Sequence, residues 1–277
     1  MGILESSGLF LSDARFVNDA SEISYGTQLF IDRLSRYVES GVDSHAAAVW
    51  KYFTEAEQLR AKREQQSIAW FSGHFYVASF CTDGNLLSQW RAYSGAGAGG
   101  CSIGFQSSEM VRRATITGNT YPPSMGPFVT LQRVIYEPDQ QAAFLDQLIA
   151  KVFALLNDRD TGTRYYLGNT LQSSVIPAIV SQIKSPVFAE EQEWRLVVQR
   201  SAGLRFRTQK GRIVPHLHCG FGRGEDGKDR LPISGIYVGP SEYSDLFRIA
   251  AGELLRSHGF NDSAVPIIDS EIPLRLS

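Results

Sequence analysis

Apolar residues recur at two kinds of interval along this chain, and the interval separates expected helices from expected strands. Spacings of three and four residues predict helices over residues 21–40, 44–71, 140–156 and 241–258. A further helical segment, over residues 168–183, contains Pro177, which should kink or split it. Shorter alternating or continuous apolar runs predict strands over residues 8–17, 129–136, 193–200, 204–208, 212–219, 235–238, 265–268 and 272–276.

The order of these elements indicates the fold class. Helices come early and strands gather late, without the regular alternation of a doubly wound parallel fold. We expect an α+β fold in which helices flank a mixed or antiparallel β core. The whole chain, residues 1–277, is expected to be a single domain with helical insertions at about 21–71 and 140–183.

The pattern of the stretch over residues 75–105 predicts that it is the centre of this organisation. It predicts a buried strand, a short polar-faced helix, a glycine-rich loop and a second strand. Rigid strands that flank hydrogen-bonding and stacking groups are typical of a binding site. The short helix carries the candidate ligand-binding residues Ser88, Gln89, Trp90, Arg91 and Tyr93.

Arg91 has two interpretations. Its guanidinium suits a phosphate or a carboxylate at the border of a cleft. Alternatively it forms a buried structural ion pair with Glu191 or Glu193, since buried charges need partners.

A second informative stretch is FAEEQEWRLVV, residues 188–198. On a strand, Glu191, Glu193 and Arg195 would share one face, and Trp194 and Leu196 the other. Two carboxylates that enter a core are costly unless they are paired or used in chemistry. We therefore expect either a catalytic pair or a structural pairing with Arg195 and Arg91.

Three weaker patterns stay open. The glycines at 95–100 could cradle a phosphate, but they match no nucleotide fingerprint and suit a flexible connection better. His216 and His218 alternate on a strand beside Cys219, but we expect no metal there, because a catalytic zinc needs three protein ligands. A basic patch could contact nucleic acid or protect a sheet edge; it consists of Arg205, Arg207, Lys210 and Arg212.

Composition narrows the class of protein. Hydrophobic residues make up 43% and charged residues 20%, which is typical of a folded protein. A net charge of -2 provides no overall attraction to nucleic acid or to anionic membranes. Three cysteines are too few for a disulfide framework, and no segment has the roughly 20 apolar residues of a membrane span. We expect a cytoplasmic protein that does not engage a membrane.

Three stretches together resemble the bacterial family known as domain of unknown function 2971. They are residues 9–26, 78–105 and 183–197. The later segments GRIVPHLHC and ISGIYVGPS fit the same pattern, so the resemblance covers nearly the whole chain. It implies no established activity.

The order of elements also resembles that of ADP-ribosyltransferases, with an early polar turn, a central strand, an aromatic-bearing helix and a late Glu-x-Glu strand. This resemblance implies NAD as substrate. Glu193 would bind the ribose hydroxyl and stabilise the oxocarbenium-like transition state, with Glu191 as its partner. Tyr93 or Trp90 would stack on nicotinamide, and Ser79 would support the ribose-binding strand.

In those enzymes an early Arg or His grips NAD, and here Arg15 or Arg91 would have to substitute for it. The resemblance thus implies a NAD-dependent ADP-ribosyltransferase or NAD glycohydrolase that acts as a toxin or antiviral effector on a protein or nucleic acid. The full set of candidate NAD-binding residues is Ser79, Ser88, Gln89, Trp90, Arg91, Tyr93, Asn18, Asp19 and Arg195.

Two other functions remain open from the sequence. A non-catalytic module could recognise nucleic acid or a protein through Asn18, Asp19, Arg91 and the basic strands. A metal-dependent nuclease could use Asp19, Glu22 and Glu193.

Overall fold

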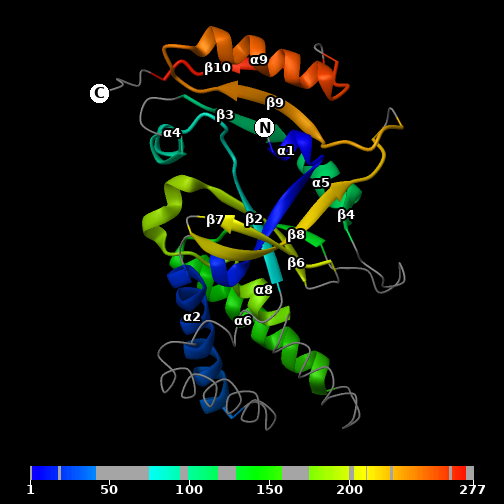
Figure 1. Cartoon of the computed structure of the whole chain (residues 1–277). Helices are drawn as coiled ribbons and strands as arrows, with labels where there is room; N and C mark the ends of the chain where they lie inside the picture. Colours follow the sequence, from blue (N-terminus) through cyan, green and yellow to red (C-terminus); the bar gives the residue numbers. More distant parts are fainter. Residues whose placement is uncertain are drawn as a thin grey trace.

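The computed structural model of the chain confirms a mixed α+β fold with a curled antiparallel sheet and several helices (Figure 1). The structure describes residues 2–17, 20–41, 75–93, 99–117, 129–157, 175–199, 203–209, 211–224, 227–261 and 264–272. The expected helix over residues 44–71, the glycine loop at 95–98 and most of the expected strand at 272–276 lie outside these ranges.

The larger sheet has seven strands, and all of its neighbours are antiparallel. Its order is β4-β8-β1-β2-β6-β5, and β7 also pairs with β8. The strands are β1 (Gly8–Asp13), β2 (Phe75–Cys81), β4 (Ala114–Ile116), β5 (Val129–Arg133), β6 (Glu193–Gln199), β7 (Arg205–Gln209) and β8 (Arg212–Phe221). Strands from both ends of the chain therefore meet in the middle of this sheet.

A smaller three-stranded sheet lies above the larger one in Figure 1. Its order is β10-β9-β3, in which β9 pairs antiparallel with β3 and parallel with β10. The strands are β3 (Cys101–Phe105), β9 (Ile233–Val238) and β10 (Ile267–Asp269). The parallel pair makes the β structure as a whole mixed.

Helices cover both ends of this arrangement. At the top of Figure 1, α9 (Ser244–Ser257) lies over the smaller sheet, and at the bottom α2 (Ala20–Glu39), α6 (Pro138–Asn157) and α8 (Ile176–Val180) form a separate packed group. Short helical segments connect the strands. They are α1 (Gly2–Glu5), η1 (Ala14–Phe16), α4 (Leu87–Tyr93), α5 (Ser107–Arg113) and η5 (Pro186–Glu191).

The two faces of the larger sheet differ in chemistry. One face packs into the main core, where Leu11, Leu196 and Leu217 are fully buried together with residues of the smaller sheet and α9. On the opposite face, Phe75, Val77 and Val197 form a small apolar cluster with Ala14 and Ala178. Because side chains alternate along a strand, that second face also carries the polar residues of β2 and β6.

Polar residues continue across this second face into the neighbouring strands. The register pairs Ser79 with Arg195, Val77 with Ser12, and Ser12 with His216. Directly paired residues share a face of an antiparallel sheet. We call this surface the polar face, and it runs from β6 through β2 and β1 to β8.

The structure corrects several expected element bounds. The first strand ends at Asp13, because the Asp13 carboxylate accepts a hydrogen bond from the Arg15 backbone N–H and starts the η1 turn. The last helix begins at Ser244, after a turn in which the Ser241 hydroxyl accepts from the Tyr243 N–H. Pro177 lies in the first turn of α8, where proline is tolerated, and the preceding part of that expected helix is outside the described residues. The sequence pattern missed α5 and β4, which are too short to show a period.

Candidate functional site

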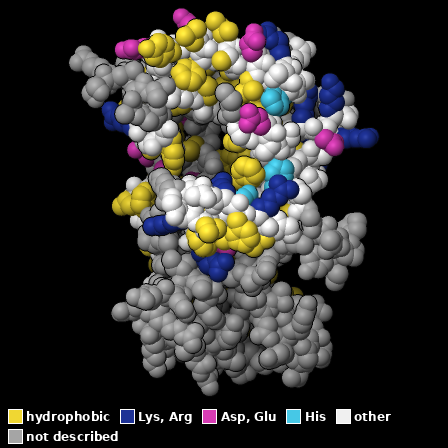
Figure 2. Space-filling model, viewed as in Figure 1, with side chains coloured by type: hydrophobic (Ala, Val, Ile, Leu, Met, Phe, Trp, Pro, Cys, Tyr) yellow, Lys and Arg dark blue, Asp and Glu magenta, His cyan; other side chains and the backbone are white. Residues whose placement is uncertain are grey.

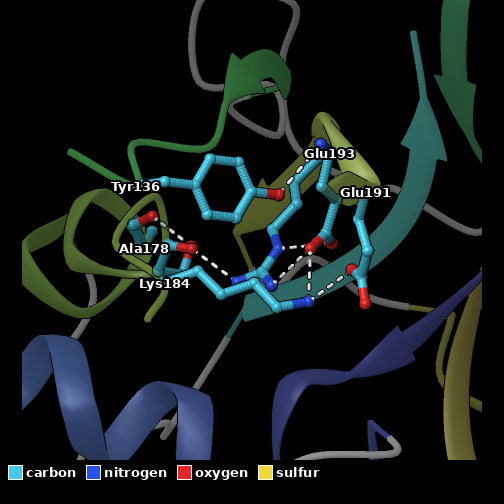
Figure 3. Close-up of polar contacts among 7 residues, drawn as sticks. Tyr136, Ala178, Lys184, Glu191 and Glu193 are labelled. Atoms are coloured by element: carbon cyan, nitrogen blue, oxygen red, sulfur yellow. Dashed lines mark hydrogen bonds and ion pairs between the residues drawn. The ribbon is translucent and has the colours of Figure 1, made fainter. Parts of the chain in front are cut away.

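Four charged side chains form one ionic cluster where β6 begins (Figure 3). Arg195 grips the Glu193 carboxylate with two nitrogens, at 2.7 Å from Nε to Oε1 and 2.9 Å from Nη2 to Oε2. Lys184 Nζ lies 3.1 Å from Glu193 Oε2 and 2.6 Å from Glu191 Oε2. Two positive and two negative charges thus balance within the cluster, which we call the β6 ionic cluster.

Burial differs sharply within the β6 ionic cluster. The side chains of Lys184, Glu193 and Arg195 are 4%, 6% and 7% exposed, whereas that of Glu191 is 33% exposed. Charges this buried are stable only when their partners are present. Glu191 is therefore the member of the cluster that solvent or a ligand can reach.

Glu191 does not lie on the strand, contrary to the sequence-based expectation. It ends the short helix η5, and Gln192 then takes a left-handed conformation with φ 44 before β6 starts at Glu193. The Thr82 backbone N–H and hydroxyl both donate to the Gln192 carbonyl and hold this turn against the end of β2. The two carboxylates consequently meet at Lys184 from different elements and not by strand alternation.

Lys184 was not singled out by the sequence analysis. It follows α8, and its backbone is held by Ile135 and by the buried Gln141 side chain, whose Nε2 donates to the Lys184 carbonyl at 2.8 Å. Its ammonium also lies 4.8 Å from the centroid of the Phe188 ring. The signal that could have found Lys184 is charge balance, because residues 183–197 hold more carboxylates than Arg195 alone can pair.

The supporting groups around Glu193 come from the segment after β5, from the residue after α8 and from β2. The Glu193 backbone N–H donates to the Tyr136 hydroxyl at 3.0 Å, as Figure 3 shows. The Arg195 Nη1 donates to the Ser181 carbonyl at 2.5 Å. From β2, Ser79 lies directly opposite Arg195, and its hydroxyl helps to lower the pKa of the Glu193 carboxyl. Ser79 itself is exposed, so the cluster has an open side beside β2.

Opposing effects set the pKa of Glu193. Burial acts to raise it, but the hydrogen bonds and charge of Arg195, the Ser79 hydroxyl and the charge of Lys184 together lower the pKa below its ordinary value of 4.5. Glu193 is therefore an ionised carboxylate at neutral pH. Burial and then the charges of Glu191 and Glu193 raise the pKa of the nearby Cys81 thiol, which makes that thiol a poor nucleophile.

The described interactions of the α4 residues do not involve the β6 ionic cluster. Trp90 is buried, its Nε1 donates to Asn85 Oδ1 at 2.9 Å, and its ring packs against Gly239 so closely that a Cβ there would lie 2.8 Å away. Arg91 is exposed, and Tyr93 is 73% exposed. Among the described residues the cations paired with Glu191 and Glu193 are Lys184 and Arg195, so the expected pairing with Arg91 is wrong.

Other candidate residues have mixed outcomes. Ser88 has a buried hydroxyl with no hydrogen-bond partner in the described part of the chain, and Gln89 is half-buried. Arg15 is occupied by a bidentate ion pair with Asp13, at 2.9 and 2.6 Å. Asn18 and Asp19 lie outside the described residues, as does the side chain of Glu22.

Residues 89–196 match the model of the family described as protein of unknown function (DUF2971). The DUF2971 match runs from α4 into β6 and contains Lys184, Glu191, Glu193 and Arg195. The resemblance that the sequence predicted over nearly the whole chain is supported for this part. Searches among curated proteins and among solved structures found no match. The resemblance to ADP-ribosyltransferases stays a prediction.

Two further findings concern metal-binding groups and membrane-spanning helices. Within the described ranges, no group of three or more His, Cys, Asp or Glu side chains is placed to hold a metal ion. The helices that the structure describes include none that is long and apolar enough to cross a bilayer.

Proposed function

We propose that the protein uses NAD as an ADP-ribosyltransferase or NAD glycohydrolase, and that the β6 ionic cluster forms its catalytic site. The observation that carries the proposal is the position of exposed Ser79 on β2, directly opposite Arg195 on β6, whose guanidinium holds the buried Glu193 carboxylate. This places a fixed carboxylate beside a solvent-facing hydroxyl, with the part-exposed Glu191 next to it.

In the proposed reaction the bond between the ribose C1′ and the nicotinamide nitrogen breaks. Its electron pair returns to the pyridinium nitrogen, so nicotinamide leaves neutral and the ribose carries the positive charge. Water or a nucleophile of the acceptor then attacks C1′ and loses one proton. A carboxylate already fixed beside the developing cation stabilises it without reorganisation.

The geometry divides the work between the two carboxylates. Glu193 already accepts two hydrogen bonds from Arg195 and one from Lys184, which fill most of its acceptor capacity. Glu191 has its described contact through one oxygen, to Lys184, and is one-third exposed. In this proposal Glu193 supplies fixed negative charge and holds Lys184, and Glu191 meets a ribose hydroxyl.

The direct test is nicotinamide release from NAD by the purified protein, with and without cell lysate as a source of acceptor. We expect release that is abolished in Glu193→Gln and Glu191→Gln. Glu190→Gln is the matched control, because Glu190 is exposed and carries the same charge one residue away.

Two outcomes would contradict the proposal. Absence of release from the wild-type protein under both conditions would remove the NAD assignment. Equal release from all variants, with folding verified by a thermal melt, would remove the β6 ionic cluster from the chemistry.

The β7–β8 hairpin favours a second candidate function, a nucleic-acid-binding module. Phe206 and Ile213 are 62% and 68% exposed on one face of the hairpin, and the exposed Arg205 and Arg212 lie on its other face. Apolar side chains gather over this hairpin and also over α9 in the space-filling view (Figure 2). Exposed aromatic and Arg side chains together suit stacking on single-stranded bases.

This second candidate predicts binding without turnover. Affinity for a labelled single-stranded oligonucleotide should fall steeply with salt and should drop in Phe206→Ala. Oligonucleotide binding that is absent at low salt, or unchanged in Phe206→Ala, would count against it.

A further inference from the structure

A second polar cluster lies on the polar face, three strands away from the β6 ionic cluster. It forms where β1, β8 and β7 lie side by side. His216 on β8 pairs with Ser12 of β1 on one side and with Arg205 of β7 on the other. The rings of Phe10 and His216 meet edge to face at 4.9 Å, and the Arg207 guanidinium lies 5.9 Å from the Phe10 centroid.

Two nitrogens in this cluster are buried without hydrogen-bond partners in the described structure. They are Nδ1 of His216 and Nε of Arg207. His216 as a whole is only 4% exposed. Most buried polar atoms in folded proteins have a partner, and an unpaired one costs free energy. The His216 ring also interacts with the Val214 backbone, so the unpaired Arg207 Nε is the stronger sign of a missing ligand.

The charge in this cluster is entirely positive. Arg207 Nη2 donates to the Ser12 hydroxyl at 2.8 Å and to Gln209 Oε1 at 3.1 Å, and both of these acceptors are neutral. The charged or titratable neighbours that act on His216 are Arg207, Arg205 and His218. Within the described ranges no ion pair joins Arg207 to a carboxylate. Among the residues that the structure describes, this guanidinium thus has no carboxylate counterion.

His218 beside this cluster has a structural task. Its Nε2 lies 3.0 Å from the Ser6 carbonyl, which accepts only, so Nε2 carries the proton. Its Nδ1 then accepts from the Thr117 hydroxyl at 3.0 Å. Both ring nitrogens therefore have fixed partners, so His218 is not a ligand group for the cluster.

From these contacts we infer that Arg207 and His216 bind a phosphate-type oxyanion, free or carried by a nucleotide, with Arg205 and Ser12 at its border. A phosphate oxygen accepts from guanidinium and imidazole N–H groups, and its charge supplies the counterion. The two nitrogens are closed to water in this conformation, so binding of the anion requires the Arg207 side chain to move. The alternative occupant is a single buried water, which would satisfy the nitrogens but not the charge.

The site is independent of the proposed NAD chemistry. It shares no residue with the β6 ionic cluster, and β2 lies between β1, which carries Ser12 and Phe10, and β6. Phosphate binding here can therefore be present or absent whether or not nicotinamide is released.

The test follows the His216 ring signals by NMR during titration with inorganic phosphate, with chloride replaced to keep the ionic strength constant. We expect a saturable shift that strengthens as pH falls, because a bound anion favours the protonated imidazole. Burial lowers the pKa of free His216, a backbone hydrogen bond with Val214 opposes this, and the charges of Arg207, Arg205 and His218 lower the pKa further, so phosphate should move that pKa upward. A parallel titration with ADP identifies the source, since tighter binding of ADP indicates a nucleotide ligand and equal binding indicates the free anion.

The matched variants are Arg207→Gln and Arg212→Gln. Arg212 is exposed at the end of the same hairpin, so its replacement removes the same charge without touching the cluster. We expect Arg207→Gln to weaken phosphate binding at least about tenfold and Arg212→Gln to change it less than about threefold. No saturable response in the wild-type protein overturns the inference whatever the variants do, and so does an equal loss in both variants. A response to chloride equal to that for phosphate indicates only general screening and overturns it too.

Discussion

Replacement of Arg195 by methionine tests the β6 ionic cluster most directly. The side chain is 7% exposed, and the change removes both hydrogen bonds to Glu193 and the bond to the Ser181 carbonyl. Methionine fills a similar volume, so the loss is chiefly electrostatic. Removing one partner of a buried ion pair typically costs about 3–5 kcal/mol, because the other charge stays buried without compensation. We expect Arg195→Met to lower the free energy of unfolding by about that amount at pH 7.

The assay is urea unfolding followed by tryptophan fluorescence, and a double-mutant cycle with Glu193→Gln isolates the pair. When the carboxylate is already neutral, loss of the guanidinium leaves a smaller penalty. The double variant should therefore be more stable than the sum of the single losses predicts, by about 1–3 kcal/mol. Arg212→Met is the control and should change stability by less than about 0.5 kcal/mol, since Arg212 is exposed. If Arg195→Met unfolds at the same urea concentration as that control, the reasoning about buried charge is refuted.

Three further predictions use other parts of the molecule. Because the pKa of Glu193 is lowered in the folded protein, its contribution to stability is present above about pH 4.5 and should disappear as pH falls below that value. Glu193→Gln should therefore flatten this part of an acid-unfolding curve. An acid-unfolding curve identical to that of the wild-type protein would contradict the lowered pKa. Burial raises the pKa of the Cys219 thiol to about 12, so iodoacetamide should label exposed Cys101 in the native protein and Cys219 only after unfolding, as peptide mass spectrometry can check. Gly239→Ala should cost about 1–3 kcal/mol in thermal melts, because the new methyl group would overlap the Trp90 ring; an unchanged melt would show that the ring can move aside.

The strands could be predicted from sequence because their apolar runs are bounded by turn residues. The expected strand at 193–200 is β6 over Glu193–Gln199, and the one at 212–219 is β8 over Arg212–Phe221. The α+β class followed from the same pattern. The pairing of Glu193 with Arg195 also followed, since residues two apart on a strand share a face.

What escaped prediction depends on single backbone conformations and on contacts between elements. The left-handed residue Gln192 follows η5 and keeps Glu191 off the strand. The spacing of apolar residues along the sequence does not predict such a backbone conformation. Lys184 reaches Glu193 across the η5 turn, so its role appears only when the fold brings the segments together. Arg91 and Trp90 are neighbours in sequence but opposite in exposure, and only Trp90 faces the core.

The position of β1 beside β8 has a consequence for biosynthesis. Gly8 pairs with Gly220, more than two hundred residues later, while β2 offers β1 only two paired positions. At about 5–20 residues per second, a ribosome needs roughly ten to forty seconds to make that intervening chain. During this interval β8 has not yet been made, so Leu9 and Leu11, which are buried in the folded protein, lack their main partner strand in the nascent chain. Chains stalled before residue 221 should therefore remain open to proteases at β1 and should bind chaperones there, and this first-made strand should become protected only when β8 leaves the ribosome.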